Sequence, residues 1–239
     1  MTSSETPTRW RRSVTELRAL IWLALPILAA QLSHTLLGFV DTAMAGRVSA
    51  VDLAAVALGN SFWVPTFLFV TGVLLIVTSK VAALNGAGRL EQTGALMRQA
   101  AWLGLALGSL AGLLLCAVEP VLHWAGVDPA LIPKSVGYIR AVALGFPAIG
   151  LYQALRGMTD GLSRTKPAMV IGFLGLILNV PANYVLVYGK LGLPAMGGVG
   201  CGVATTLVMW FMLACMVLHL KRASLYRACG LFERFEWPN

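Results

Sequence analysis

Long apolar runs with few charges alternate with short polar segments along this chain of 239 residues. A helix needs about 20 apolar residues to cross the hydrocarbon core of a bilayer, and each run reaches that length. The pattern therefore predicts an all-α integral membrane protein, folded as one bundle of six transmembrane helices. The runs occupy residues 19–46, 53–79, 99–118, 135–155, 167–189 and 191–220.

Composition supports the membrane class and narrows the chemistry. Hydrophobic residues make up 58% of the chain, charged residues 12%, and the mean hydropathy is +0.77, which exceeds what a soluble domain can bury. The sequence contains no phosphate-binding glycine loop, His-Glu-x-x-His motif or Gly-x-Ser-x-Gly motif. We therefore expect neither an ATPase nor a hydrolase, and no cofactor.

The basic residues predict the orientation of the bundle. All but four of the 18 lysines and arginines flank the runs on the side that holds both chain ends, and such residues concentrate on the cytoplasmic side. We expect a cytoplasmic segment at residues 1–18, the six-helix bundle at 19–220 and a cytoplasmic tail at 221–239. This topology explains the net charge of +8 without a nucleic-acid partner. The four exceptions are Arg47, Lys134, Arg140 and Lys190, and the long side chain of Arg140 can reach the membrane interface.

Asp41 is the one charged residue within the run 19–46. An ionised carboxylate in hydrocarbon is costly, so such a residue usually faces a protein interior or an aqueous cavity on an ion or substrate pathway. Pro26 removes a backbone hydrogen bond earlier in the same helix and is a candidate hinge. Gln31 and His34 lie between the two; His34 shares nearly the face of Asp41, and both are candidates for cavity lining.

Polar residues of the fifth and sixth helices are candidate partners of Asp41. Asn179 and Asn183 are one turn apart, as are Cys201 and Thr205, and all lie at a depth similar to that of Asp41. Their oxygens, with that of Asp41, suit a hard cation such as Na⁺, whereas the sulfur of Cys201 suits one poorly. The carboxylate can instead hold a proton, because burial favours its neutral form. The asparagines have a further interpretation, as hydrogen bonds between helices.

Two segments resemble a known family. The run GFVDTAMAGRVSAVDLAAVALGNS begins at Gly38, and RGMTDGLSRTKPAMVIGFLGLILNVPANYVLVYGKLGLPAMGGVGCGVAT ends at Thr205. Together they resemble the N-terminal half of multidrug and toxic compound extrusion (MATE) transporters, most closely the NorM branch. The resemblance covers nearly the whole chain.

The resemblance implies secondary active efflux of organic cations and other amphipathic toxic compounds, in exchange for Na⁺ or H⁺, across a bacterial inner membrane. It implies a cation site at Asp41 with Asn179, Asn183, Cys201 and Thr205 around it, and bending of the first helix at Pro26. It also implies a fold of two six-helix lobes beside a central cleft, of which this chain supplies the N-terminal lobe.

Length is where the chain departs from the family, whose members are about twice as long. The missing C-terminal lobe can belong to the same gene, to a separate partner chain or to a second copy, and we favour a fragment of one gene. Other interpretations are a lipid-linked oligosaccharide flippase of the same superfamily, a non-transporting half-size membrane protein, and an intramembrane enzyme that uses Asp41 and His34 as acid and base. The coupling ion and the drug spectrum stay open.

Overall fold

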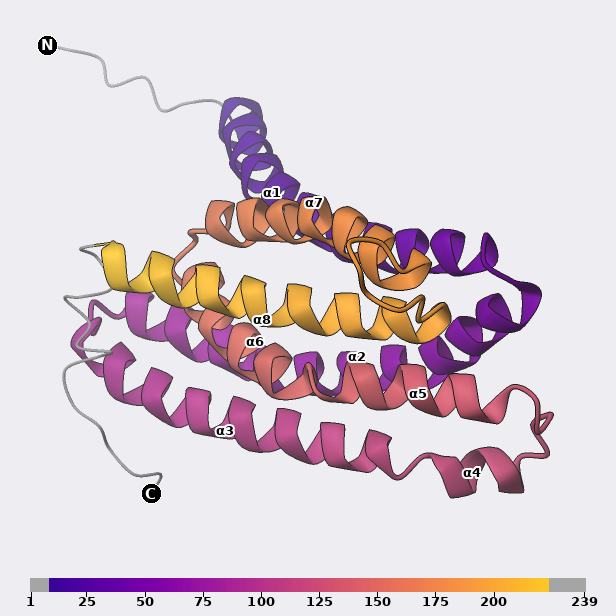
Figure 1. Cartoon of the computed structure of the whole chain (residues 1–239). Coiled ribbons are helices and arrows are strands. Elements are labelled where there is room, and N and C mark those ends of the chain that lie inside the picture. Colours follow the sequence, from indigo (N-terminus) through magenta and orange to yellow (C-terminus); the bar gives the residue numbers. More distant parts are fainter. Residues whose placement is uncertain (1–8, 224–239) are drawn as a thin grey trace, which may run out of the picture.

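The computed structural model describes residues 9–223, which form eight α-helices and the connections between them (Figure 1). Within that part there is no β-strand. The helices are α1 (Arg9–Gly46), α2 (Ala50–Gly86), α3 (Glu91–Cys116), α4 (Glu119–Trp124), α5 (Ile132–Ala143), α6 (Phe146–Gly161), α7 (Lys166–Tyr188) and α8 (Gly198–Arg222). The first begins at Arg9, ten residues before the first apolar run, so part of the predicted N-terminal segment 1–18 is helical. Residues 1–8 and 224–239, which include most of the predicted tail, lie outside the described residues.

The prediction of an all-α bundle with six spans is confirmed, with one span broken. Helices α1, α2, α3, α7 and α8 are each long and apolar enough to cross a membrane, and α5 with α6 makes a sixth span bent by 41°. The bend follows from Pro147 in the first turn of α6, since proline cannot donate a backbone hydrogen bond into α5. Arg140 therefore lies in the first half of a broken span, where it is half exposed and forms a 2.7 Å ion pair with Glu119.

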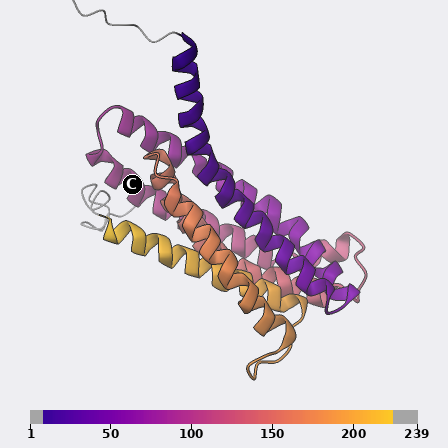
Figure 2. The same ribbon diagram turned by 90° about the horizontal axis from the view of Figure 1, so that it is seen from above.

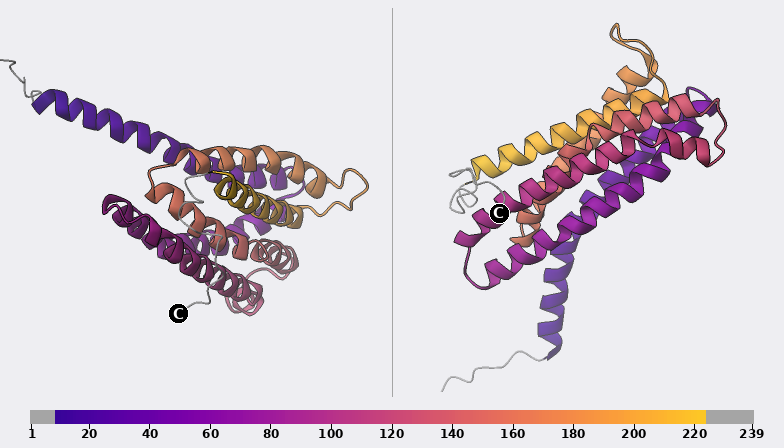
Figure 3. Two further views of the ribbon diagram at one scale, coloured as in Figure 1. Left: turned by 90° about the vertical axis from the view of Figure 1, so that its left-hand side faces the viewer. Right: turned by 90° about the horizontal axis from the view of Figure 1, so that it is seen from below.

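Helix α6 lies inside the bundle and packs against α2, α3 and α8 (Figures 1 and 3). Glycines make its approach to α3 close: a methyl group on Gly104 would collide with the carbonyl oxygen of Gly150, and one on Gly108 with that of Phe146. Small residues at such crossings let backbones pack tightly in a membrane, where apolar burial gives little driving force. This packing holds the two halves of the broken span against α3.

The two ends of the bundle differ in charge. The basic end, defined by the start of α1, the α2–α3 and α6–α7 turns and the end of α8, holds both limits of the described chain (Figure 1). The far end holds the α1–α2, α4–α5 and α7–α8 connections, together with Arg47, Lys134, Arg140 and Lys190. An even number of spans brings the chain back to the end where it started.

The N-terminal part of α1 projects from the bundle, and the helix changes direction before it runs along α7 (Figure 2). Pro26 lies inside this helix and is buried. Its missing N–H leaves the carbonyl four residues earlier without its helical donor, which is a usual cause of a bend.

Candidate functional site

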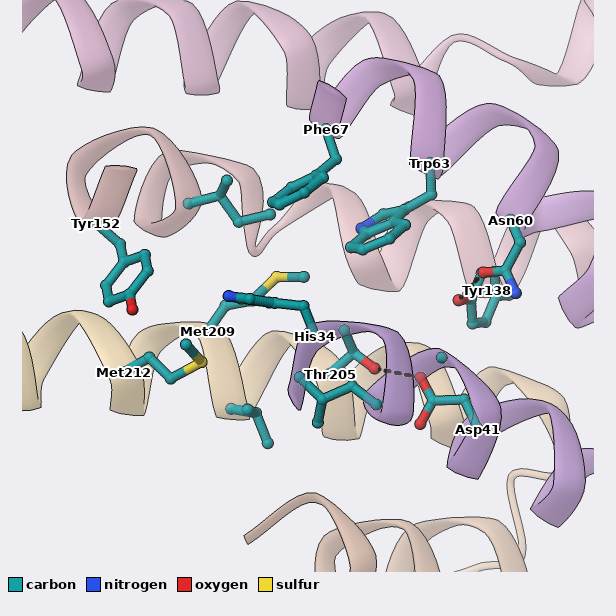
Figure 4. Close-up of a pocket in the computed structure, with 14 residues that line it drawn as sticks. His34, Asp41, Asn60, Trp63, Phe67, Tyr138, Tyr152, Thr205, Met209 and Met212 are labelled. Carbon is teal, nitrogen blue, oxygen red and sulfur yellow. Dashed lines mark hydrogen bonds between the residues drawn. The ribbon is translucent and has the colours of Figure 1, made fainter. Parts of the chain in front are cut away.

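Asp41 is buried five residues before the end of α1, with 2% of its surface exposed. Its Oδ1 accepts from Asn183 Nδ2 at 2.6 Å and from Asn179 Nδ2 at 3.3 Å. Its Oδ2 accepts from Thr205 Oγ1 at 2.7 Å (Figure 4), and its backbone carbonyl accepts from Cys201 Sγ at 3.5 Å. The structure thus brings together, on α1, α7 and α8, the five residues that the sequence proposed.

Helical spacing and small residues produce this arrangement. Asn179 and Asn183 stand one turn apart on α7, and Asn183 Nδ2 also donates to Asn179 Oδ1 at 3.0 Å. Helix α8 can approach because Gly200 packs on the backbone of Leu186 and Gly202 on that of Tyr138, where no larger residue fits. The glycine-rich start of α8 thereby positions Cys201 and Thr205 against α1.

The donors around Asp41 are all neutral. Within residues 9–223 no lysine or arginine pairs with this carboxylate, so its charge is stabilised by hydrogen bonds alone. The buried Oδ1 of Asn183 has no hydrogen-bond partner in the described part of the chain. Rotating the Asn183 amide group by 180° would exchange its nitrogen and oxygen and place the oxygen beside the carboxylate. That oxygen, the carboxylate and the Thr205 hydroxyl would then form a set of oxygen ligands suited to Na⁺. No group of three His, Cys, Asp or Glu side chains able to hold a metal exists among the described residues.

A small cavity of about 50 Å³ extends from Asp41 toward the centre of the bundle (Figure 4). Water takes about 30 Å³ per molecule in the liquid, so this space is of the size of an ion or one to two waters. We call it the Asp41 cavity. It is lined by His34, Leu37, Gly38, Asp41, Asn60, Trp63, Phe67, Tyr138, Ile149, Tyr152, Thr205, Val208, Met209 and Met212.

Three residues that line this cavity, from α1, α2 and α6, each have a buried polar atom without a partner in the described part of the chain. His34 Nε2, Trp63 Nε1 and the Tyr152 hydroxyl are buried and lack a hydrogen-bond partner within residues 9–223. Figure 4 shows His34 between Asp41 and Tyr152, along the cavity that begins at the carboxylate. His34 therefore lies where the sequence placed it, along the same cavity as Asp41. Gln31 does not, because it is exposed and borders a different cavity nearer the basic end.

Several lining residues carried no recognisable signal in the sequence. Tyr138 is 2% exposed and donates to Asn60 Oδ1 at 2.9 Å, and Trp63 stacks on Phe67 with ring centroids 5.2 Å apart. Aromatic residues in a membrane protein are as readily assigned to the interface as to a cavity. The sequence alone does not reveal the break between α5 and α6, which places Tyr138 and Tyr152 on separate helices that both line the cavity.

A second buried carboxylate, Asp52, lies at the far end. It is 2% exposed, forms a 2.7 Å ion pair with Lys134 of α5, accepts from Ser49 Oγ and accepts from the backbone N–H of Gly198 at 2.9 Å. Asp52 thus ties α2, α5 and the first turn of α8 together. Unlike Asp41, it has a cationic partner, which is typical of a structural role.

The fold and the site define a polytopic membrane protein with a buried polar site between α1, α7 and α8. The family model named MatE matches residues 26–185, and the chain belongs to the MATE family. It is 55% identical over 225 residues to the multidrug resistance protein PmpM of Pseudomonas aeruginosa, covering 94% of this chain and 47% of that protein. It is 46% identical over 230 residues to the multidrug resistance protein MdtK of Yersinia pestis, covering 96% and 50%.

Solved structures agree on the fold. The eukaryotic MATE transporter AtDTX14 superimposes with a TM-score of 0.84 at 20% sequence identity, over 92% of this chain and 50% of that one. The chain therefore spans about half the length of the relatives it matches, and corresponds to their N-terminal half, one lobe of the fold.

Proposed function

We propose that this chain forms the N-terminal lobe of a multidrug antiporter of the bacterial inner membrane, on the NorM branch of the family. In this proposal organic cations and amphipathic toxic compounds leave the cell in exchange for Na⁺ or H⁺, and the exchanged cation binds at Asp41. Support comes from the family membership and from two relatives that are named multidrug resistance proteins.

The observation that carries the proposal is a buried carboxylate whose hydrogen-bond partners are all neutral. Such a group can gain a proton or bind Na⁺ without displacing a fixed positive charge, and either event removes its net charge. The donors Asn179, Asn183 and Thr205 then lose an anionic acceptor, so their hydrogen bonds must rearrange. Cation binding at Asp41 thereby alters how α1 packs against α7 and α8.

The proposed hinge at Pro26 would convert this local change into movement. Asp41 and Pro26 share α1, and α1 packs chiefly along α7, which carries both asparagines. If the cation and the drug favour different positions of α1, binding of one disfavours binding of the other. A single charge that crosses 100 mV supplies about 2.3 kcal/mol for such a cycle.

In the proposed orientation the basic end faces the cytoplasm and both termini are cytoplasmic. Asp41 then lies in the outer half of the membrane, where an external cation can reach it. The other half of the substrate pathway would come from a C-terminal lobe, supplied by the same gene, by a partner chain or by a second copy.

The other interpretations have less support. A flippase for lipid-linked oligosaccharides is expected to use a more basic cavity, whereas no lysine or arginine lines the Asp41 cavity. An enzyme using Asp41 and His34 as acid and base has less support because the described lining of the Asp41 cavity contains neither a second carboxylate nor a cysteine. A non-transporting half-size protein would tolerate replacement of Asp41.

The test is ethidium efflux by cells that produce the gene product containing this chain, with and without Asp41→Asn. We expect the variant to lose efflux by about tenfold or more, equivalent to about 1.4 kcal/mol of coupling energy. Thr66→Val is the matched control, because Thr66 bonds to its own helix at Phe62 and lies outside the Asp41 cavity. Proteoliposomes with an imposed Na⁺ or pH gradient then identify the coupling ion. Efflux by Asp41→Asn at the wild-type rate would refute the proposal.

A further inference from the structure

The break between α5 and α6 interrupts the backbone hydrogen bonds of the fourth span. Here the N–H of Gly145 donates to Val142 O at 2.9 Å, three residues earlier, instead of to Ala141 O, four residues earlier. The last carbonyls of a helix have no donor within it, and Pro147, just beyond α5, has no N–H to supply. Carbonyls freed inside a membrane need other donors, because the hydrocarbon core offers no water.

Two side chains of α8 supply donors at the break. Thr206 Oγ1 donates to Ala141 O at 2.6 Å. Trp210 Nε1 donates to Leu144 O at 3.2 Å. Thr206 and Trp210 are one helical turn apart, so they lie on the same face of α8. We call this pair of hydrogen bonds the α8 clasp.

Glycines let α8 follow the fourth span closely past the break (Figure 1). A methyl group on Gly145 would lie 2.5 Å from Met209 Sδ and 3.1 Å from Thr206 Oγ1. One turn earlier on α8, a methyl group on Gly202 would lie 2.7 Å from the carbonyl oxygen of Tyr138. Helix α8 is therefore packed against α5 and against the break itself.

Both halves of the broken span form part of the wall of the Asp41 cavity. Helix α5 contributes Tyr138, and α6 contributes Tyr152. The bend of 41° between the two helices therefore sets how far apart these parts of the wall lie. Helix α8 connects the bend with the carboxylate, because Thr205 donates to Asp41 Oδ2 at 2.7 Å while its neighbour Thr206 holds the break.

We propose that Thr206 and Trp210 are positioning residues for the cation site, because their hydrogen bonds hold the bend that shapes the Asp41 cavity. Loss of the clasp would let the angle between α5 and α6 vary, so a smaller fraction of molecules would have the binding geometry. A site that is competent in only a fraction of molecules binds its ligand more weakly by that fraction. That a cation binds at Asp41 rests on the proposed function, whereas the clasp does not.

The experiment measures cation binding by the purified gene product containing this chain, in nanodiscs. The probes are radioactive sodium at fixed pH and proton uptake in sodium-free solution. Thr206→Val keeps the shape of the side chain but removes its donor, and should weaken the binding that depends on Asp41 by about threefold to tenfold, as for one hydrogen bond. Thr206→Ser keeps the hydroxyl and should bind as the wild type does.

Thr66→Val is the matched control for the loss of a threonine hydroxyl. Thr66 Oγ1 also donates to a backbone carbonyl, that of Phe62 at 2.8 Å, but it lies on α2 and outside the lining of the Asp41 cavity. We expect this variant to bind the cation as the wild type does.

A spectroscopic signal separates positioning from a general loss of stability. Trp210 does not line the Asp41 cavity, so the fluorine resonance of Trp210 in protein labelled with 5-fluorotryptophan reports on the clasp. This resonance is identified by its absence from Trp210→Phe. Because cation binding removes the anionic acceptor of Thr205, α8 should move, and saturating cation should shift the resonance in the wild type. The shift should be absent in Asp41→Asn and reduced in Thr206→Val.

A second variant replaces Thr206→Val if that protein does not fold. Trp210→Phe keeps an aromatic ring but removes the N–H donor, and should weaken cation binding about twofold, because its bond is longer and exposed. Unchanged binding in the variant used, equal weakening by Thr66→Val, or a Trp210 resonance that ignores the cation would overturn this proposal alone. Cation binding that survives Asp41→Asn would refute the proposed function, and this proposal with it.

Discussion

The Asp41 cavity and a second cavity, which is lined by Gln153 and Asp160 and is called the Gln153 cavity, each have a carboxylate in the wall, and the two carboxylates differ in how their charge is balanced. Asp41 is held by neutral amide and hydroxyl donors, in a space of about 50 Å³. Asp160 is paired with Arg156 and borders about 380 Å³. A carboxylate without a cationic partner can respond to an ion, whereas a compensated one provides a hydrogen-bond acceptor in a neutral pocket. The contrast therefore separates a small cavity with an uncompensated carboxylate from a larger cavity with a paired one.

The largest effect should come from removing the shortest hydrogen bond to Asp41. Asn183→Leu deletes the 2.6 Å donor and leaves the carboxylate partly unsatisfied. A hydrogen bond to a charged group contributes about 1.5–3 kcal/mol, so ion-driven efflux should fall by about tenfold to a hundredfold. Asn179→Leu, which removes the 3.3 Å contact, should cost less. Equal efflux by Asn183→Leu and wild type, at matched membrane protein levels, would show that the neutral donors around Asp41 do not matter for ion-driven efflux.

Asp52 extends the comparison to a third carboxylate, which is 2% exposed. Its ion pair with Lys134 predicts a structural role, so Asp52→Asn should lower stability without changing ion dependence. We expect a loss of about 1–2 kcal/mol, less than for a fully buried pair because Lys134 is 44% exposed. Thermal unfolding in detergent measures the first effect, and the half-saturating Na⁺ or H⁺ concentration for efflux measures the second. A shift in that concentration would mean that Asp52, like Asp41, takes part in ion coupling.

Phe67→Ala should join the two cavities, because this ring lines both. Ion movement without substrate should then rise by about threefold, since a loss of the order of 0.6 kcal/mol in the barrier is enough. The measurement is Na⁺ or H⁺ flux into proteoliposomes free of drug. Phe69→Ala is the control, since Phe69 is two residues away, 62% exposed, and lines neither cavity. Equal leak in both variants would show that Phe67 does not separate the sites.

His34→Leu should give the smallest effect. It removes a polar atom from the Asp41 cavity that has no partner in the described chain and lies beyond direct contact with the carboxylate. We expect a change of about twofold in the ion concentration for half-maximal efflux, as for a weak interaction of about 0.4 kcal/mol. A complete loss of efflux would mean that His34 takes part in coupling directly.

The helices and the residues around Asp41 were predictable because both depend on local spacing. Apolar runs set the spans, and the one-turn spacing of Asn179 with Asn183 and of Cys201 with Thr205 set their shared faces. A lone carboxylate inside an apolar run identified the centre of the group. The roles assigned to these residues remain predictions.

The Gln153 cavity was not predictable because its contacts join distant parts of the chain. Gln153 and Thr71 are 82 residues apart; Thr71 lies within the apolar run 53–79 and Gln153 near the end of the run 135–155, and neither stands out as a polar residue. Asp160 follows Arg156 by one turn, which is typical of an exposed helical ion pair rather than of a cavity wall. The bend between α5 and α6, set by Pro147, also determines which residues of the fourth span face inward, and an unbroken run of residues 135–155 conceals it.

Equilibrium cation binding tests the central claim most directly. Binding of radioactive sodium and uptake of protons are measured on the purified gene product containing this chain, for wild type, Asp41→Asn, Asp52→Asn and Asp160→Asn. The account predicts that one of the two signals disappears in Asp41→Asn and persists in the two variants whose carboxylates have basic partners. Cation binding that survives Asp41→Asn, or that is lost instead in Asp160→Asn, would contradict it.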